Sequence, residues 1–366
     1  MDDILARAHE PWVSFQLGLR EVCRCRPGGI VVVMGPSGSG KTSLVADLLV
    51  NHARHYGPAV YLSLELEGDE LAARVVGMQT NASWEQVLKG DVPREHMVHA
   101  SNIPRLVLVE EEDASLASMR ATVEGMREVY IDEPIVVAVD YIQIFEADEQ
   151  EHRQRVALVM KALKRIAKQL RIVVVALNQM SRENARIARS GDKLGVETAD
   201  LAAESAAIER YASNTISIGG IKNIGDDGDQ SVQLSLGKGR MGGGDRVLPA
   251  RYEGRTGRWI IEGDSRPAAE VKAELAEAKK SNAVEGALMS VLGAASKLTQ
   301  PTTRSDLVLL AHCNKQLGYV AITRLIKTGE LVEVRMKKKG TGGGWMICPP
   351  ELAKETQLPL LGEVPS

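Results

Sequence analysis

A glycine-rich segment near the N-terminus has the composition needed to hold phosphate groups. Residues 35–42 read GPSGSGKT, which fits the pattern G-x-x-x-x-G-K-[ST]. Its glycines allow tight curvature that turns backbone N–H groups toward phosphate oxygens, and the following helix adds its N-terminal dipole. In this pattern Lys41 reaches the β- and γ-phosphates and Thr42 ligates Mg²⁺. The predicted site for ATP consists of Gly35, Pro36, Ser37, Gly38, Ser39, Gly40, Lys41, Thr42 and Ser43.

Carboxylate and amide side chains follow three apolar runs further along the chain. Asp140 ends IVVAVD, Glu65 ends AVYLSLE and Gln179 ends IVVVALNQ. The carboxyl ends of parallel strands share one edge of a sheet, so we expect these residues beside Thr42. There Asp140 would hold Mg²⁺, Glu65 would orient the attacking water and Gln179 would bind the γ-phosphate. Alternatively, Asp140 only caps the end of its strand, Gln179 is an amide in a loop without a role, and Glu67 takes the place of Glu65.

Apolar runs rich in Val and Ile alternate with helical stretches through the first 180 residues, which predicts an α/β fold with a mostly parallel sheet. The predicted strands are 30–34, 59–65, 106–110, 135–140 and 172–178, and the helices are 42–56, 67–78, 83–89, 115–130 and 152–170. After a polar loop at 180–200, four closely spaced strands predict an antiparallel extension, at 213–218, 231–236, 246–251 and 258–261. Residues 1–27 are expected to form a short helical lead-in.

Composition limits the classes of protein that remain. The hydrophobic share is 44% and the net charge is −3, so a nucleic-acid partner must be recognised by local patches. No apolar run is long enough for a membrane span, and the N-terminus is not a secretory signal, which favours a cytoplasmic protein. Cys23 and Cys25 form a CxC without a second pair, and we expect free thiols rather than a metal site.

In this order, the motifs resemble the RecA-like motor domain of DnaB-type hexameric replicative helicases. The specific signal is SLE, DYIQ, ALNQMSR and KGR at the proper spacing after the P-loop, over about residues 20–262. The resemblance implies that Glu65 is the catalytic carboxylate, Asp140 the Walker B acid and Gln179 the γ-phosphate sensor. The matching segments are 27–43, 60–65, Arg74 in DELAARV, 136–145, 163–183, 204–209 and 236–240.

The same resemblance implies a ring in which subunits share their sites. Lys238 and Arg240 would reach into the neighbouring subunit, where a cation stabilises charge on the γ-phosphate. The loop at 180–200 would line the central channel and track single-stranded DNA through its cations. Those cations are Arg182, Arg186, Arg189 and Lys193. Alternatively, Lys238 and Arg240 belong to a basic turn between two strands, and the segment 180–200 is a solvated loop.

Two departures from the family pattern affect the expected partners. Helicases of this family carry an N-terminal helical domain that engages primase, whereas about 27 residues precede the core here, so no primase partnership is expected. The segment ADLAAES (199–205) lacks the arginine that is common before the Glu-Ser pair. The details of DNA contact can therefore differ from those of the family.

The C-terminal third predicts a separate small domain. After a motor domain at 28–263, residues 264–283 predict a solvated helical linker rich in Ala, Glu and Lys. Residues 284–350 predict three helices and a glycine-tipped hairpin, which resemble a winged-helix domain. The proposed recognition helix, at about 315–328, and the tip of the hairpin would contact duplex DNA. Their cations are Lys315, Arg324, Lys337, Lys338 and Lys339. Winged helices also serve as protein-interaction modules, and that interpretation stays open.

The tail at 351–366 has no periodic pattern and predicts disorder. Within it QLPLL, Gln357–Leu361, resembles the short peptide by which bacterial replication proteins bind the sliding clamp. The alternative is a tail that is simply rich in leucine.

These observations together predict an ATP-dependent, ring-forming DNA helicase that moves along single-stranded DNA, in the replication of a phage, plasmid or mobile element. The alternative is an ATP-switched DNA-bound assembly, such as an initiator, loader or recombination ATPase, in which hydrolysis only releases the assembly. A signalling ATPase without nucleic acid is a third interpretation, which the basic loop and wing disfavour.

Overall fold

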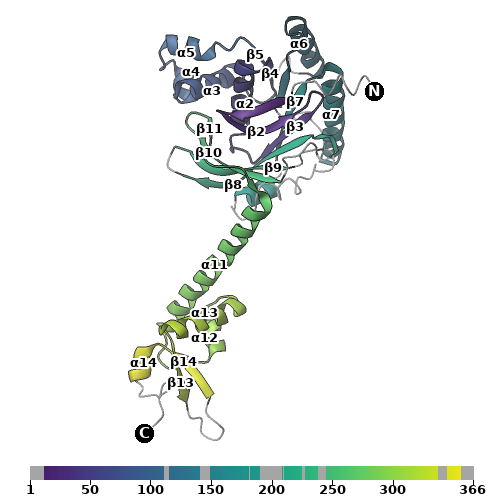
Figure 1. Cartoon of the computed structure of the whole chain (residues 1–366). Coiled ribbons are helices and arrows are strands. Elements are labelled where there is room, and N and C mark those ends of the chain that lie inside the picture. Colours follow the sequence, from purple (N-terminus) through teal and green to yellow (C-terminus); the bar gives the residue numbers. More distant parts are fainter. Residues whose placement is uncertain are drawn as a thin grey trace. The chain divides into compact units, whose positions relative to one another are not determined.

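The computed structural model describes residues 12–110, 115–140, 149–180, 182–189, 208, 210–224, 227–237, 245–336 and 344–355. The chain divides into two compact units, Met1–Lys272 and Ala273–Ser366. Figure 1 labels many of the helices and strands of both units.

The first unit is built on one large sheet. Within the described residues its strands run in the order β11-β10-β9-β8-β3-β7-β6-β4-β5, and β12 pairs with β10. The strands from β5 to β8 pair in parallel, whereas β8, β9, β10 and β11 pair antiparallel. The prediction of a mostly parallel sheet with an antiparallel extension is confirmed. The strands are β3 (Ile30–Gly35), β4 (Ala59–Ser63), β5 (Leu106–Val109), β6 (Val136–Asp140), β7 (Val173–Gln179), β8 (Asn214–Asn223), β9 (Gln230–Gly237), β10 (Arg246–Glu253), β11 (Arg258–Ile261) and β12 (Arg266–Pro267).

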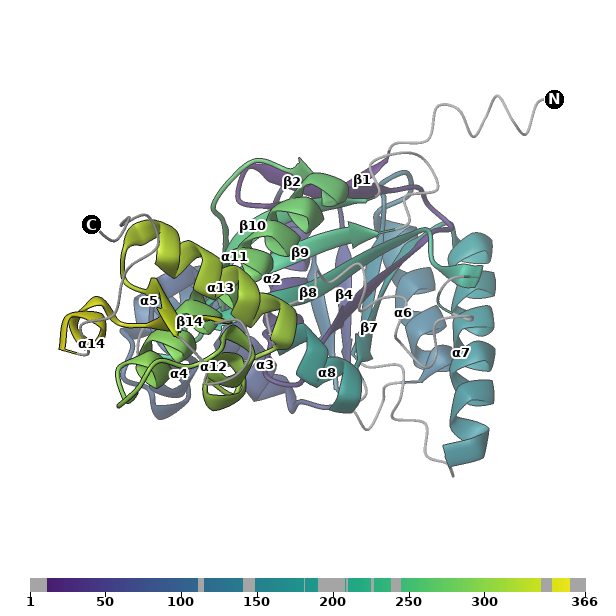
Figure 2. The ribbon, with the colours of Figure 1, turned by 90° about the horizontal axis from the view of Figure 1, so that it is seen from below.

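Helices connect the strands and cover the sheet. They are α2 (Lys41–His55), α3 (Gly68–Thr80), α4 (Trp84–Lys89), α5 (Arg94–Ser101), α6 (Leu116–Val129), α7 (Glu149–Leu170) and α8 (Arg182–Arg189). The helix α5 was not predicted, and α8 occupies part of the segment predicted as a polar loop. Figure 2 shows α6 and α7 together on one side of the sheet.

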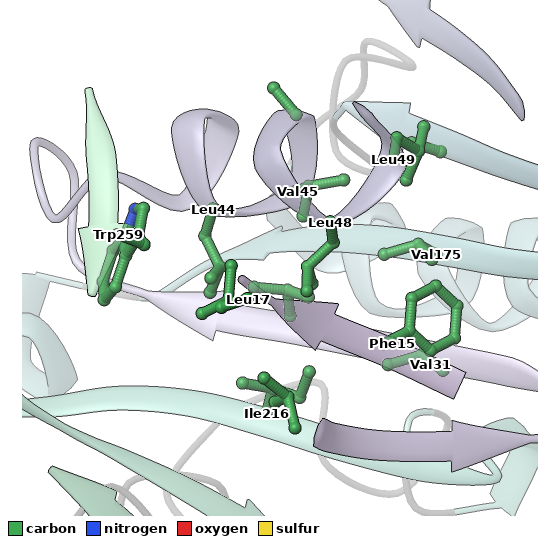
Figure 3. Packing of buried hydrophobic residues seen from close by; sticks show 14 of the residues in the cluster. Phe15, Leu17, Val31, Leu44, Val45, Leu48, Leu49, Val175, Ile216 and Trp259 are labelled. Atoms are coloured by element: carbon green, nitrogen blue, oxygen red, sulfur yellow. The ribbon is translucent and has the colours of Figure 1, made fainter. Parts of the chain in front are cut away.

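The central strands are apolar at every position because both of their faces are covered. On β3, Ile30 and Val32 belong to the core cluster that includes residues of α6 and α7. Val31 and Val33 point the other way, into the cluster that includes α2. Figure 3 shows this second cluster, in which Leu44 and its neighbours on α2 pack toward the sheet. A strand with one polar face could not occupy this position without burying that face.

The segment before β3 corrects the sequence prediction. Residues 13–25 form an antiparallel hairpin of β1 (Val13–Leu17) and β2 (Arg20–Cys25), not a helical lead-in. The sequence VSFQL alternates apolar and polar residues, which is the period of a half-buried strand. Val13, Phe15 and Leu17 are all buried, and Figure 3 shows the latter two within the α2 cluster. The hairpin therefore seals the edge of that core.

The described part of the second unit contains four helices and a two-stranded hairpin. Its elements are α11 (Ala268–Ala295), α12 (Arg304–Leu310), α13 (Lys315–Thr328), β13 (Val332–Met336), β14 (Gly344–Cys348) and α14 (Pro350–Glu355). The predicted linker at 264–283 and the predicted helix from 284 are mostly parts of the single helix α11. Its buried residues Ala287, Val291 and Ala295 recur every four positions and pack with α12 and α13 residues.

The beginning of the predicted disordered tail is ordered. Residues 350–355 form α14, and Ala353 is buried in a small cluster with Val334 and Cys348. Burial of this alanine explains why a segment with little periodicity is helical. The remainder of the tail, including the predicted clamp-binding peptide Gln357–Leu361, lies outside the described residues.

In the described part of the chain, no helix is both long and apolar enough to span a membrane. No group of three or more His, Cys, Asp or Glu side chains there is placed to hold a metal ion. Cys23 and Cys25 are free thiols on β2, and burial raises the pKa of both.

Candidate nucleotide-binding site

The glycine-rich loop joins the end of β3 to the start of α2, as its sequence predicts. Gly38 and Gly40 have φ of +73° and +76°, which side chains with a Cβ rarely adopt. Ser39 Oγ and Lys41 Nζ both donate to the Pro36 carbonyl, at 2.8 and 2.9 Å. The loop is thus closed on itself beside the N-terminus of α2, where backbone N–H groups lack helical partners.

Two strands of the antiparallel extension, β10 and β11, contact this loop. Trp259 Nε1 donates to the Gly40 carbonyl at 3.2 Å, and the Trp259 and Tyr252 ring centroids are 5.2 Å apart. A Cβ on Gly40 would lie 2.7 Å from the Tyr252 ring. The strands β10 and β11 therefore fix the position of the P-loop, although they follow it by more than 200 residues.

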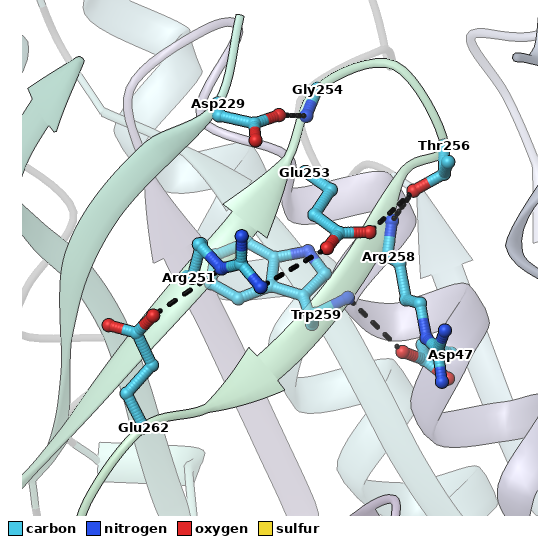
Figure 4. Close-up of polar contacts among 9 residues, drawn as sticks. All are labelled: Asp47, Asp229, Arg251, Glu253, Gly254, Thr256, Arg258, Trp259 and Glu262. Carbon is cyan, nitrogen blue, oxygen red and sulfur yellow. Dashed lines mark hydrogen bonds and ion pairs between the residues drawn. The ribbon is translucent and has the colours of Figure 1, made fainter. Parts of the chain in front are cut away.

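Polar contacts hold the β10–β11 turn in shape (Figure 4). Asp229 accepts from the Gly254 backbone N–H at 3.0 Å, and Glu253 accepts from the Thr256 hydroxyl at 3.1 Å. Asp47 of α2 accepts from the Trp259 backbone N–H at 3.4 Å. These contacts connect the turn to neighbouring strands and to α2, so the aromatic rings below the P-loop are held from two sides.

Asp140 ends β6 and is 2% exposed. Its Oδ2 accepts hydrogen bonds from Thr42 Oγ1 at 2.8 Å and from the Tyr61 hydroxyl at 2.7 Å. The Thr42 proton points at the carboxylate, which leaves an oxygen lone pair of Thr42 available for a cation. The pair therefore fits Mg²⁺ that arrives with a nucleotide, with the phosphates as additional ligands.

Glu65 and Gln179 reach the same pocket from two other strands. The pocket is lined by the P-loop, Glu65, Arg74, Asp140, Gln179 and Tyr252, with Leu66. Glu65 is exposed and lies two residues beyond β4, not at its last residue. Gln179 is the last residue of β7 and is in register with Gly35 of β3. The structure thus brings the predicted residues together, while their catalytic roles remain predictions.

Burial and charge shift the ionisation of these groups in opposite directions. Burial raises the pKa of Asp140, and the hydrogen bonds from Tyr61 and Thr42 oppose that rise. Burial, and then the charge of Asp140, raise the pKa of Glu65, whereas Lys41 lowers it. Burial lowers the pKa of Lys41, although both carboxylates act against this. A partly buried cation that is close enough to two carboxylates to affect their pKa suits a site that receives a strongly anionic ligand.

The segment predicted as a channel loop begins as the helix α8. Ala188 and Asn184 are buried on it, so residues with a polar composition gain a helical structure by packing. Arg182, Arg186 and Arg189 are all exposed on this helix. Arg189 also donates from Nη2 to the Ser37 carbonyl of the P-loop at 2.6 Å. This bond connects α8 to the nucleotide loop, and DNA contact by these cations stays a prediction.

Several predicted site residues lie outside the described residues. They are Lys193, Lys238, Arg240, Lys337, Lys338 and Lys339. The strand β9 ends at Gly237, immediately before Lys238. In the second unit, Lys315 is the first residue of α13 and Arg324 lies in its third turn, and both side chains are exposed.

Three pocket residues were given no role by sequence reasoning: Tyr61, Arg74 and Tyr252. Tyr61 lies inside a buried strand, where an aromatic residue indicates packing, and only the pairing of β4 with β6 reveals its bond to Asp140. Arg74 was part of a recognised motif without an assigned function. Tyr252 is far from the P-loop in sequence, and no local pattern could have associated the two.

Residues 22–256 match the family model described as DnaB-like helicase C terminal domain, which is more than half of the 366-residue chain. A protein of Chlamydia trachomatis described as "Probable plasmid replicative DNA helicase" is 26% identical over 167 residues, 43% of this chain and 36% of that protein. The replicative DNA helicase DnaB of Buchnera aphidicola subsp. Acyrthosiphon pisum is 26% identical over 224 residues, 58% of this chain and 48% of that protein. The chain thus spans less than half the length of these curated relatives.

Solved structures resemble the fold of the first unit. The ATPase domain of G40P superposes with a TM-score of 0.56 at 16% identity, over 65% of this chain and 86% of that chain. A DnaB-like replicative helicase, solved to show its interactions with primase, superposes with a TM-score of 0.52 at 16% identity, over 65% of this chain and 58% of that chain. At this identity the likeness concerns the fold, and it agrees with the RecA-like core predicted from the sequence.

Proposed function

Since the chain belongs to the DnaB-like helicase C-terminal domain family, we propose that it is an ATP-dependent DNA helicase that forms a ring, most simply a hexamer, and moves along single-stranded DNA. The relatives from Chlamydia are described as probable plasmid replicative DNA helicases, which favours a role in plasmid replication. Replication of a phage or another mobile element would require the same activity. Strand separation is the reaction, and ATP hydrolysis supplies its free energy.

One observation carries the proposal: the Thr42 hydroxyl and the Asp140 carboxylate are 2.8 Å apart in a pocket that the P-loop and Glu65 also line. In this arrangement Lys41 would bind the β- and γ-phosphates, and Thr42 with Asp140 would hold Mg²⁺, which supplies positive charge that neutralises the phosphate oxygens. Glu65 lines the same pocket, and its carboxylate would accept a proton from the attacking water.

The remaining residues of the site belong to the ends of other strands. Gln179 ends β7 beside Gly35, which suits a hydrogen bond to the γ-phosphate that is lost after hydrolysis. Lys238 and Arg240 follow β9, and we propose that they enter the neighbouring subunit's pocket. A cation donated from a neighbour stabilises charge that develops on the γ-phosphate. Hydrolysis would then require an assembled ring.

DNA contact is proposed for both units. Arg182 and Arg186 on α8, with Lys193 beyond it, would contact the backbone of a single strand. Lys315 and Arg324 on α13 of the second unit would contact duplex DNA, together with the lysines at 337–339. The peptide Gln357–Leu361 would bind a sliding clamp.

The second unit also supports a second candidate, an ATP-switched assembly on duplex DNA. Its helices and hairpin follow the order expected of a winged helix, and Lys315 and Arg324 are exposed on α13. In that case nucleotide controls assembly, and hydrolysis releases the protein without processive movement. ATPase activity stimulated by single strands with directional movement favours the helicase, whereas assembly that depends on duplex without movement favours the switch.

Displacement of one strand from a forked duplex tests the proposal. We expect unwinding that requires ATP and Mg²⁺, and a purified ring that hydrolyses ATP without separating any forked substrate would refute it. The Glu65→Gln protein should bind ATP and lose turnover, whereas normal hydrolysis by this variant would exclude Glu65 as the base.

The donated cation has its own test. A Lys41→Ala chain cannot use its own pocket, and an Arg240→Ala chain cannot complete its neighbour's pocket. Mixed rings of the two variants should recover part of the ATPase activity, because the intact pocket of an Arg240→Ala chain can then receive the intact cations of a Lys41→Ala neighbour. Activity equal to the sum of the separate variants would contradict sharing between subunits.

A further inference from the structure

The two-stranded hairpin of the second unit exposes a tryptophan. Trp345 on β14 is 49% exposed, and among the described residues it belongs to no hydrophobic cluster. In contrast, Trp12 and Trp84 are half-buried and Trp259 is buried. An indole ring has a large apolar surface, which is mostly covered in folded proteins. The ring of Trp345 therefore offers an open apolar face to a ligand.

The position of Trp345 along its strand explains why the ring is exposed. Ile347 lies two residues further along β14, on the same face of the hairpin, and it is buried with residues of α11, α12 and α13. Thr302 forms an isolated bridge with Ile347, with hydrogen bonds in both directions. In the described part of the second unit this bridge does not continue to Trp345, so the ring lies past the edge of the core.

An arginine lies beside the exposed ring. Arg335 of β13 is opposite Trp345 in the hairpin register, and its Cζ is 6.0 Å from the ring centroid, at the limit of a cation–π contact. Glu333 on the same strand is bound by Arg304, whose Nε and Nη2 donate to Oε1 at 3.2 and 2.6 Å. That carboxylate is therefore engaged, and the exposed guanidinium of Arg335 can contact an external anion.

We propose that Trp345 stacks on an unpaired nucleobase of DNA and that Arg335 binds an adjoining phosphate. The proposal rests on DNA contact by the second unit, but not on movement along DNA. Bases within a duplex are already stacked on their neighbours, so a protein ring stacks most readily on a base that is unpaired. The ligand is thus the single strand beside a duplex end. The site gives the second unit a preference for such an end over blunt duplex.

Charge favours a nucleic acid over a protein as the ligand of this ring. An exposed tryptophan also suits a protein interface, but the hairpin sequence 332–348 contains four cations and one acid. The acid is Glu333, which Arg304 binds. A positively charged surface with an aromatic ring is the combination that binds the phosphates and the bases of a single strand. The cations are Arg335, Lys337, Lys338 and Lys339.

Photocrosslinking on the full chain without nucleotide locates the contact. The DNA is a short duplex with a thymine overhang in which one base is replaced by iodouracil, and the comparison is a blunt duplex of the same paired sequence. On illumination, iodouracil reacts with an aromatic ring that is stacked on it. We expect a crosslink at Trp345, identified by mass spectrometry of the digested protein.

Affinities for the same two DNAs measure the contribution of each side chain. Trp345→Ala should weaken binding of the overhang DNA by about 5- to 30-fold, or ~1–2 kcal/mol, and change binding of the blunt duplex by less than about twofold. Trp345→Phe should lie close to wild type, because it keeps an aromatic ring. Arg335→Ala should weaken the overhang DNA and lower its salt dependence by about one phosphate contact.

Trp12→Ala is the matched control. Trp12 belongs to the first unit, and its ring also lies beside an arginine, with Arg26 Cζ 4.5 Å from the centroid. This variant should leave both affinities and the crosslink at Trp345 unchanged, which separates the hairpin ring from a general effect of removing a tryptophan.

Three results would overturn the proposal. Crosslinks at other residues, together with unchanged affinities of Trp345→Ala, would remove the contact. Equal weakening of overhang and blunt DNA would assign Trp345 to the shape of the hairpin. Association between chains that is lost in Trp345→Ala, with DNA binding unchanged, would assign the ring to a protein interface. A chain that crosslinks at Trp345 but separates no forked duplex would support this site and refute only the helicase.

Discussion

Replacing Gly40 with alanine should destabilise the first unit more than replacing Gly38, although both glycines have left-handed backbones. A Cβ at Gly38 would meet no atom within 4 Å, whereas a Cβ at Gly40 would lie 2.7–2.9 Å from three carbons of the Tyr252 ring. That ring cannot easily retreat, because it packs against Trp259. The two substitutions therefore differ mainly in this contact.

The expected magnitudes follow from the two contributions. A non-glycine residue in the left-handed region costs roughly 1–2 kcal/mol, and reduced freedom of the unfolded chain returns about 0.4–1 kcal/mol. Gly38→Ala should thus lower the free energy of unfolding by about 1 kcal/mol. Forcing a methyl group against a packed ring adds roughly 1–3 kcal/mol, so that Gly40→Ala should lower it by about 2–4 kcal/mol.

Urea unfolding without nucleotide, followed by tryptophan fluorescence, measures these values. A Trp345→Phe background removes the tryptophan of the second unit, so the signal reports the first unit. In a Tyr252→Leu background, Gly40→Ala should cost about 1–3 kcal/mol less than in the wild type, because the ring is gone. This cycle also cancels the backbone contribution. An equal effect in both backgrounds would refute the conclusion that Tyr252 supports the P-loop.

Three further predictions concern ionisation and packing. Tyr61→Phe removes a hydrogen bond that lowers the pKa of Asp140, so the acid limb of the ATPase pH profile should move to higher pH; an unchanged limb would contradict a role for the Asp140 carboxylate. Burial raises the pKa of Asp47 to about 6, which favours its neutral form in the folded state. The free energy of unfolding should therefore fall as pH rises from 4 through 6, and Asp47→Asn should abolish this dependence, a difference of up to about 3 kcal/mol at pH 8 by urea titration. Leu307 is fully buried in the second unit, and Leu307→Ala should destabilise that unit by about 2–5 kcal/mol while calorimetry shows unchanged ATP binding.

The amino-acid sequence alone was sufficient to predict those parts of the site that are continuous in the chain or that end an apolar strand. The P-loop is a continuous segment, so phosphate and Mg²⁺ binding by its glycines, Lys41 and Thr42 could be predicted once a strand precedes and a helix follows. Asp140 and Gln179 could be placed because they end apolar runs, and parallel strands bring such ends to one edge. The same rule placed Glu65 near them, although it lies two residues beyond its strand.

Local patterns were misread where packing decides between two structures. The alternation in VSFQL indicates a strand, and the hairpin of β1 and β2 confirms that period over the expected helix. The segment from Arg182 is polar enough for a loop, but burial of Ala188 stabilises a helix there. That helix directs Arg189 to the Ser37 carbonyl, a contact that composition cannot indicate.

Only the tertiary structure reveals which distant residues complete the pocket. Trp259 bonds to Gly40 across 219 positions and Tyr61 to Asp140 across 79. Both contacts depend on the order of strands in the sheet. Sequence patterns report which residues are buried and in what period, but many strand orders bury the same residues equally well. The choice among them is made by the packing of all strands and helices at once, and this packing places an aromatic ring below the P-loop.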